Sequence, residues 1–285
     1  MKRTLFTLVA FSAMNFLSAQ SNSLNLEQTG DKNITDLVQT GSGNKSTMVQ
    51  KASSNEASVS QIGKANVLDH NSTGDNAKVT VVQLGDNNST LQLITKANVI
   101  AVASSKGNGN AVTQRVLSAA SEVNAIQEGD DNLVVQQQTS NAAGQNFSGI
   151  KQVGSKNKSF SEQTGENNRA SDEQTGNSTF SAVSQIGTSN SVGIIQKGGD
   201  NNSVNVAQDG TNNFAGAPDA DLVQRLVQNG NANEIILNQK GNQNTTAITQ
   251  TGNGNSSTVG QTGDLHKSII TQTGNLNKAA VKQSN

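Results

Sequence analysis

The sequence predicts an all-β protein, a β-solenoid in which two strands form each 22-residue rung and about eleven rungs stack parallel and in register. Three observations predict this fold: an 11-residue repeat, a glycine-containing corner in each repeat, and alternation of apolar and polar residues between the corners. A fixed short period of this kind is typical of a stacked, quasi-one-dimensional structure.

Each repeat has a Gln, a Gly two places later, an Asn three places after that, and a seven-residue arm that runs from this Asn to the next Gln. The period holds in steps of 11 from Gln28 to Gln138, is shifted by three residues before Gln152, and opens its last run at Gln228. Within the first run the Gln is replaced at four positions, Ser72, Ile94, Ser105 and Val116. We therefore expect one solenoid domain at 20–285, with irregular segments near 139–151 and 209–227 and a bulged loop at 214–221 around Pro218.

The arm and the corner have different conformational requirements. Seven residues suit a β-strand, and the Gly of each four-residue corner supplies the positive φ that a tight bend needs. A helix is excluded as the repeating element, because a Gly every 11 residues would cost about 1 kcal/mol each relative to Ala and no apolar stripe of period 3.6 is present.

Strand parity sorts the residues of each arm. Alternate residues face the same side, so an inward Gln places the residues two and four before it, and the Asn six before it, on the inner face. The column two before Gln is apolar in most arms, as at Leu26, Leu37 and Met48, with exceptions at Gln136, Ser161 and Asp172. The intervening positions carry Lys, Glu, Asp, Asn and Ser and are expected to face water.

Two arrangements of such arms compete. In antiparallel hairpins an inward Gln would lie beside Val or Leu, and a buried polar group without a partner costs about 1–3 kcal/mol. In stacked rungs Gln lies on Gln and Asn on Asn, so that the side-chain amides bond one another along the stack. We therefore predict amide ladders, which would also form the assembly surface, at Gln28, Asn33, Gln39, Asn44, Gln50, Gln61, Gln163, Asn168, Gln185, Asn190, Gln239, Asn244, Gln250, Asn255, Gln261, Gln272, Asn277 and Gln283. The corner glycines expected beside them are Gly30, Gly41, Gly63, Gly165, Gly187, Gly241, Gly252, Gly263 and Gly274.

The composition and the first residues point to an exported protein with a thin core. Residues 1–19 have the charged start, apolar middle and small-residue exit of a secretory signal peptide, with cleavage expected after Ala19. The chain has no Cys, and 32% apolar residues are too few for one thick core in 285 residues. The charged residues are scattered and the net charge is −1, so the sequence offers no basic stripe for nucleic acid. No membrane insertion is expected either, since the apolar run is shorter than a membrane span.

The sequence contains no pattern that indicates catalysis, a cofactor or a metal site. His70 falls in the inner apolar column and His266 takes the place of a ladder Asn, so both are interpreted as substitutions within the repeat. A polysaccharide-cleaving β-helix would need long loops around a cleft, and an ice-binding solenoid would need an outer Thr ladder; neither is present. A monomeric β-solenoid surface adhesin or stalk that does not polymerise stays open as the alternative function.

The repeat resembles the curlin repeat of curli subunits, which form amyloid fibres on bacterial surfaces. Residues 39–45 (QTGSGNK) and 272–279 (QTGNLNKA) carry the resemblance most closely, and the pattern covers nearly the whole chain after residue 20. The resemblance implies a secreted subunit, of the major or the nucleator type, in the fimbriae of the biofilm matrix that serve cell adhesion and aggregation. It also implies a companion subunit, a dedicated outer-membrane secretion pore and accessory proteins.

The expected function is self-assembly into a homopolymer. An arm begins at Asn22 and another ends at Gln283, so both ends are expected to present the same ladder residues and to template another copy head to tail. The acidic arms that hold Ser161 and Asp172 inward, with Glu162, Glu166 and Glu173 nearby, either delay premature assembly or reflect drift in a tolerant repeat.

Overall fold

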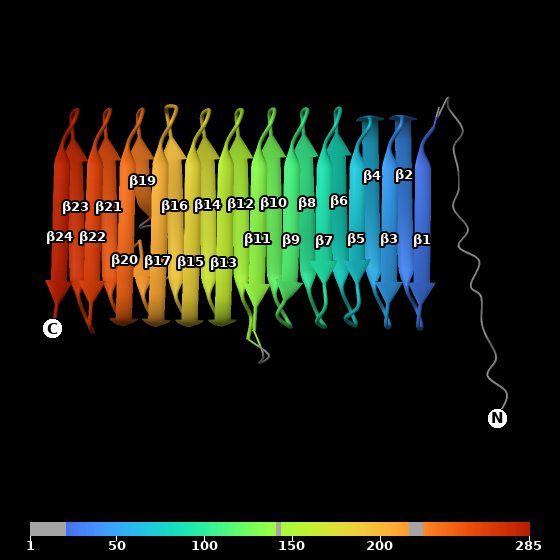
Figure 1. The fold of residues 1–285 in the computed structure, drawn as a ribbon, viewed down its shortest axis with the longest axis horizontal. Helices are drawn as coiled ribbons and strands as arrows, with labels where there is room; N and C mark the ends of the chain where they lie inside the picture. Colours follow the sequence, from blue (N-terminus) through green and yellow to red (C-terminus); the bar gives the residue numbers. More distant parts are fainter. Residues whose placement is uncertain (1–20, 141–143, 217–224) are drawn as a thin grey trace.

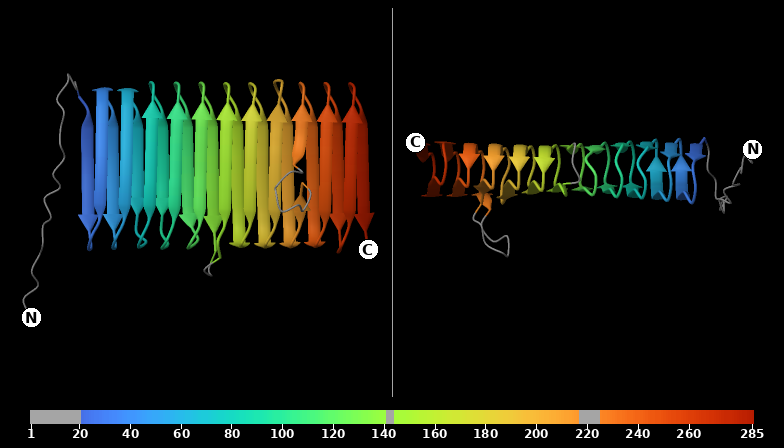
Figure 2. Two further views of the ribbon diagram at one scale, coloured as in Figure 1. Left: turned by 180° about the vertical axis from the view of Figure 1, so that it is seen from behind. Right: turned by 90° about the horizontal axis from the view of Figure 1, so that it is seen from below.

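The computed structural model describes residues 21–140, 144–216 and 225–285, and this part of the chain is a β-solenoid without any helix. The predicted fold class is confirmed. Successive strands along the chain lie alternately in two sheets of parallel strands, and the two sheets face each other across a thin core (Figure 1). Figure 2 shows these two sheets as the two faces of a flat rod, with β1 and β24 at opposite ends. The predicted signal peptide at 1–19 and Pro218 lie outside the described residues.

Sheet A contains every second arm, starting with the first. Its twelve strands, in spatial order, are β1 (Ser23–Thr29), β3 (Lys45–Lys51), β5 (Val67–Ser72), β7 (Ser89–Ile94), β9 (Ala111–Leu117), β11 (Leu133–Thr139), β13 (Lys158–Glu166), β15 (Phe180–Thr188), β17 (Ser203–Thr211), β20 (Glu234–Asn242), β22 (Ser256–Thr262) and β24 (Lys278–Ser284).

Sheet B contains the arms in between. Its strands are β2 (Ile34–Ser42), β4 (Glu56–Lys64), β6 (Lys78–Leu84), β8 (Ile100–Lys106), β10 (Glu122–Glu128), β12 (Phe147–Val153), β14 (Arg169–Thr175), β16 (Ser191–Lys197), β18 (Phe214–Ala215), β19 (Leu226–Asn229), β21 (Thr245–Thr251) and β23 (Lys267–Thr273). β18 and β19 share one level, because both pair with β16 on one side and with β21 on the other. The described chain therefore has twelve strand levels in sheet A and eleven in sheet B.

All strand pairs are parallel, and most place each residue beside the one 22 positions later. Gln28 pairs with Gln50 in sheet A, and Gln39 pairs with Gln61 in sheet B. The shifts in the repeat are accommodated without loss of register: Gln127 pairs with Gln152, 25 residues on, and Gln208 bonds Gln239, 31 residues on. The two insertions therefore leave the stack continuous.

The second insertion interrupts a strand in its middle. Phe214 and Ala215, which the sequence suggested as part of a bulged loop, instead pair with Ser191 and Val192 as the first half of the level. Ala215 is buried and continues the inner column of sheet B. The level resumes at Leu226, which pairs with Ile194.

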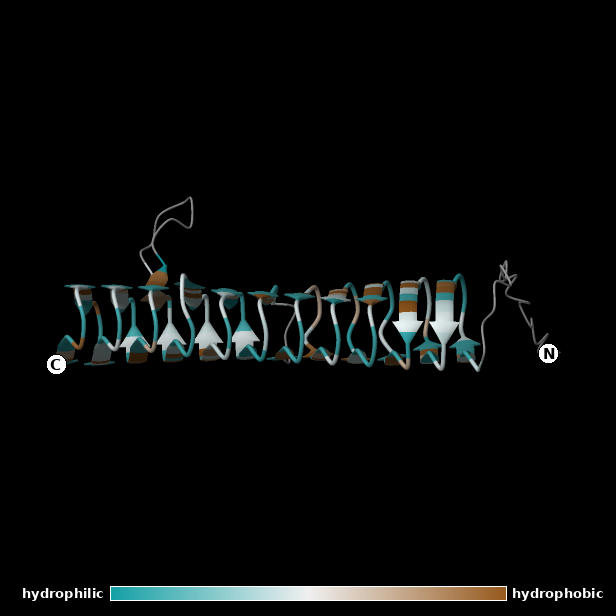
Figure 3. Ribbon diagram, turned by 90° about the horizontal axis from the view of Figure 1, so that it is seen from above, coloured by the Kyte–Doolittle hydropathy of each residue, from teal (hydrophilic) through white to brown (hydrophobic). Residues whose placement is uncertain are grey.

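The core consists of two apolar clusters placed end to end along the rod. One runs from Met48 to Ile150 and the other from Ala170 to Ile270. Hydrophobic and hydrophilic residues are distributed along the whole rod rather than gathered at one end (Figure 3). In the described part of the chain no helix could cross a membrane.

Candidate assembly site: amide ladders and end rungs

The Gln side chains form two ladders, one behind each sheet. Where the next rung also carries a Gln, the ladder Gln donates from Nε2 to Oε1 of that Gln, as from Gln39 to Gln61 at 2.7 Å and from Gln163 to Gln185 at 2.8 Å. The same Nε2 group also donates to a backbone carbonyl of the preceding arm in the opposite sheet, as from Gln61 to Lys45 at 3.2 Å. The ladders therefore join successive rungs and also join the two sheets, and the Gln-to-Gln hydrogen bonds all point toward the C-terminal end of the rod.

The Asn side chains form a second pair of ladders at the corners. The backbone N–H of Asn66 donates to Oδ1 of Asn44 at 3.1 Å, and Nδ2 of Asn44 donates to the carbonyl of Gly63 at 3.0 Å. The corresponding bonds join Asn277 to Asn255 and Asn255 to Gly274. Each Asn thus satisfies backbone groups that the bend would otherwise leave buried and unpaired.

The corner glycines are required for two reasons. Gly41 has a φ of 102°, a conformation that a side chain strongly disfavours. A Cβ at Gly41 would also collide with the carbonyl oxygen of Gly63, one rung on. The other predicted corners also have positive φ values, which are 103° at Gly30, 125° at Gly63, 107° at Gly165, 112° at Gly187, 113° at Gly241 and Gly252, 112° at Gly263 and 105° at Gly274. A Cβ would collide with a carbonyl oxygen one rung on at each of these corners except Gly263 and Gly274, which lie in the last rung.

The predicted ladder residues lie where the repeat puts them. Apart from those of the end rungs, they are buried and bonded to their counterparts one rung away, and the bonds between successive ladder Gln side chains are 2.7–3.0 Å long. The ladder behind sheet A is broken where Ser72, Ile94 and Val116 replace Gln.

A substitute ladder, which the sequence analysis missed, covers part of this break. Gln92 donates to Gln114 at 2.8 Å, and Gln114 donates to Gln136 at 2.9 Å, two residues nearer the centre of the strands. The bulky Ile94 and Val116 fill the space of the missing Gln side chains. The signal was available in the spacing, since these three Gln residues are each 22 positions apart.

One polar layer separates the two apolar clusters. Asp172 is buried between Ile150 and Ile194 in sheet B, and Ser159 donates to its carboxylate at 2.6 Å from the opposite sheet. Burial raises the pKa of the Asp172 carboxyl to about 6, with the Ser159 hydrogen bond opposing the shift. Ser161 is also buried in this layer, so the sequence correctly indicated both inward exceptions.

The two His residues have the positions that the repeat predicts. His70 is buried in the inner column between Met48 and Gln92, and burial lowers its pKa to about 4, opposed by the Gln92 side chain. His266 occupies an Asn position, where its backbone N–H donates to Oδ1 of Asn244 at 3.0 Å. No cluster of three or more potential metal-ligating side chains occurs in the described ranges.

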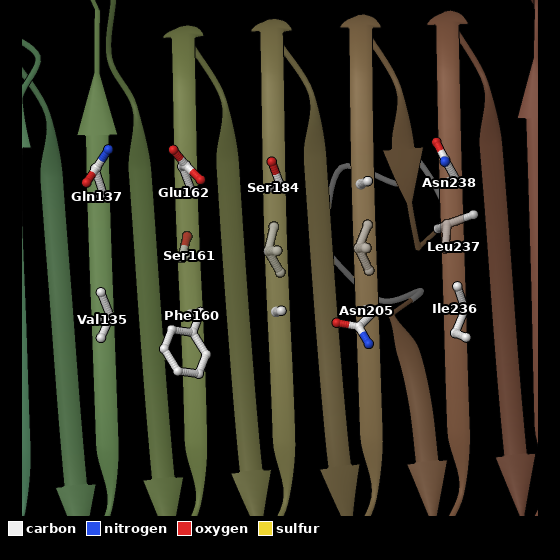
Figure 4. Close-up of a pocket in the computed structure, with 14 residues that line it drawn as sticks. Val135, Gln137, Phe160, Ser161, Glu162, Ser184, Asn205, Ile236, Leu237 and Asn238 are labelled. Atoms are coloured by element: carbon white, nitrogen blue, oxygen red, sulfur yellow. The ribbon is translucent and has the colours of Figure 1, made fainter.

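The outer face of sheet A has one open hollow in its middle. Small side chains on β15 and β17, including Ala182 and Ala207, form its floor, with Phe160 on β13 at one side and Ile236 on β20 at the other (Figure 4). Glu162 is the one ionisable side chain that lines it.

The two end rungs differ from the interior in having uncovered edges. Leu24 on β1 is 38% exposed, whereas Leu68, in the same column on β5, is 1% exposed. At this end no described residue donates to Oε1 of Gln28 or Gln39. At the other end Nε2 of Gln272 and Gln283 donate to the backbone carbonyls of Ser256 and Lys267, and no further Gln follows within the described chain. One end thus offers amide acceptors and the other amide donors.

Fold and ladders together define a β-solenoid stabilised by stacked Gln and Asn side chains. The family model of the curlin associated repeat matches this chain twice, at residues 31–63 and 230–263. These two matches support assignment to the curlin-repeat family, which is a family of structural fibre subunits. The matched segments lie near the two ends of the rod, one running from β2 into β4 and the other spanning β20 to β22. No curated protein matches the chain.

Proposed function

We propose that this protein is a secreted structural subunit that polymerises head to tail into curli-like functional amyloid fibres outside the cell. The observation that carries the proposal is the pair of unlike end rungs. Parallel strand edges and aligned amides give the rod a polarity, so that the acceptor end of one copy complements the donor end of another. Biofilm matrix formation, surface adhesion and aggregation are the proposed roles of the fibre.

The proposed partners are those that the curlin resemblance implies. They are other copies of this chain, a companion subunit, and an outer-membrane secretion pore with accessory proteins. The predicted signal peptide at 1–19 supports export, and the proposed location is the bacterial cell surface or its matrix.

The backbone at the donor end suggests a selective way to block growth. In most rungs the N–H of the first strand residue donates to the carbonyl of the residue 21 positions on, as from Lys45 to Asn66 and from Ser256 to Asn277, both at 2.8 Å. No described residue accepts from the N–H of Lys267 or Lys278, and in the proposed polymer the following molecule supplies these carbonyls. Replacing both by Pro removes these two N–H groups without removing a bond inside the rod.

The test is seeded assembly of the chain from residue 20, followed by thioflavin fluorescence and electron microscopy. We expect fibres, a lag phase that preformed seeds shorten, and strong inhibition in the K267P/K278P variant. The matched control is K267A/K278A, which loses the same two charges but keeps both N–H groups and should elongate normally. Single short rods in the micrographs of the unmodified chain would favour the monomeric adhesin and contradict the proposal.

A further inference from the structure

The number of strand levels in the rod is odd. Sheet A has twelve and sheet B has eleven, so the described polypeptide begins and ends in the same sheet, with β1 and β24. The chain therefore has 23 strand levels in all and passes from one sheet to the other 22 times between the first level and the last. Parity of this kind decides how one copy can continue another.

The two sheets present chemically interchangeable edges. Both carry an inward Gln with an apolar residue two places before it, as Gln28 with Leu26 in β1 and Gln39 with Leu37 in β2. The corners on the two sides of the rod have the same geometry, with φ of 103° at Gly30 and 102° at Gly41. Each arm is thus related to the next by a half-turn about the rod axis and a rise of half a rung.

Direct translation of one copy onto another breaks this alternation. If β1 of the next copy lies on β24, sheet A continues, but β2 of that copy is two strand spacings from β23, roughly 10 Å. One strand level is then missing from sheet B at every junction. The side chains of Ile270 and Leu37 would face an empty level of the core, and one of the two Gln ladders would be interrupted.

A half-turn restores the alternation. If β1 of the next copy lies on β23, its β2 lies on β24, and both sheets continue at the normal spacing. Ile270 then covers Leu26, and Val281 covers Leu37, so that both apolar columns continue. Gln272 and Gln283 reach Gln28 and Gln39 of the next copy, so both ladders continue as well. Two strand pairs form at the junction in place of one.

We infer that successive copies in the fibre are related by a half-turn about the fibre axis, a two-fold screw in which the two sheets exchange at every junction. This inference rests on the proposed polymer and applies to the polypeptide whose first and last strands are β1 and β24. The rise per copy is then eleven and a half rungs, roughly 55 Å, against roughly 58 Å for direct translation.

Cysteine cross-linking distinguishes the two junctions, because the sequence contains no Cys. In the screw junction Glu27 lies beside Thr271 of the preceding copy, whereas in direct translation it lies beside Lys282. All three side chains face outward and are exposed. Neighbouring parallel strands bring Cα atoms to about 4.8 Å, within the range of a disulfide.

Fibres are grown from the double variants E27C/T271C and E27C/K282C, oxidised, dissolved in denaturant and run on non-reducing gels. Glu27 lies on β1, at the opposite end of the rod from β23 and β24, which carry the two partners, so every disulfide joins two molecules. We expect a ladder of covalent oligomers from E27C/T271C and at least tenfold less from E27C/K282C. The reverse result, or fibres in which neither pair is linked, would overturn the screw while leaving the polymer itself intact.

A parity change gives an independent control. Deleting 278–285 leaves eleven levels in each sheet, and this shortened chain should stack by direct translation, so that helical reconstruction finds no half-turn. Deleting the 22 residues 256–277 removes a whole rung and should keep the half-turn. The same symmetry in both variants would contradict the inference. Absence of fibres from the unmodified chain would instead contradict the proposed function.

Discussion

His70 and Asp172 should give this solenoid opposite responses to acid. Both side chains are buried in the core, one in the first apolar cluster and the other in the polar layer between the clusters. Burial disfavours the charged form of each, so it lowers the pKa of His70 to about 4 and raises the pKa of Asp172 to about 6.

The sign of each contribution follows from which state binds the proton more tightly. The folded chain holds the Asp172 proton more tightly than the unfolded chain does, so stability is greatest below the ordinary pKa of 3.8 and falls as the pH rises to about 6. The folded chain holds the His70 proton more weakly, so stability is complete above 6.5 and falls as the pH drops to about 4. At 1.36 kcal/mol per unit of pKa, each contribution is about 3 kcal/mol.

The two contributions offset each other in the unmodified chain, and substitution should separate them. H70M, which repeats the Met48 found one rung earlier, should be about 3 kcal/mol less stable at pH 7 than at pH 4. D172N should be less stable at pH 4 than at pH 7 by a similar amount. The double variant provides the baseline, because it retains the other ionisable groups of the chain.

The assay is urea unfolding followed by circular dichroism at several pH values, with D36N as a control at an exposed position on β2. The reasoning would be refuted if H70M and D172N showed pH profiles that coincide with that of the double variant. It would equally be refuted if both single variants lost stability in the same direction of pH.

Further substitutions test the corners and the ladders. G41A should destabilise the rod by at least about 2 kcal/mol, because it combines a positive φ with a collision against the Gly63 carbonyl. The control G260A, in β22 with open space around it, should change stability by less than about 0.5 kcal/mol. The midpoints of urea unfolding compare the two variants. Q185A should cost about 3 kcal/mol or more, since it removes the bonds that Gln163, Gln208 and the carbonyl of Arg169 each make with the Gln185 amide. S184A on the outer face should be nearly neutral, and a loss in Q185A no larger than that of S184A would mean that the ladders contribute little.

Much of the fold could be predicted from the repeat because its residues have few alternatives. A Gln every 11 residues is inward by strand parity, and an inward amide has a partner only if rungs stack, as Gln39 and Gln61 do. The same parity located Asp172 and His70 in the core.

Other features could not be obtained from the 11-residue frame. The Gln92–Gln114–Gln136 ladder lies two positions out of that frame, and it depends on Ile94 and Val116 filling the space that Gln leaves. The split of one level into β18 and β19 was missed because Phe214 and Ala215 are too short a segment to show alternation. Both depend on packing between rungs rather than on pattern within one arm.

The central claim is that copies of this rod join end to end through the same strand pairing and amide ladders that join its rungs. High-resolution cryo-electron microscopy of the fibres tests it most directly. The account predicts two parallel sheets that run uninterrupted across every junction, with strands perpendicular to the fibre axis at about 4.8 Å spacing and Gln272 of one copy in contact with Gln28 of the next. Rods packed side by side, or neighbouring arms paired antiparallel, would contradict it.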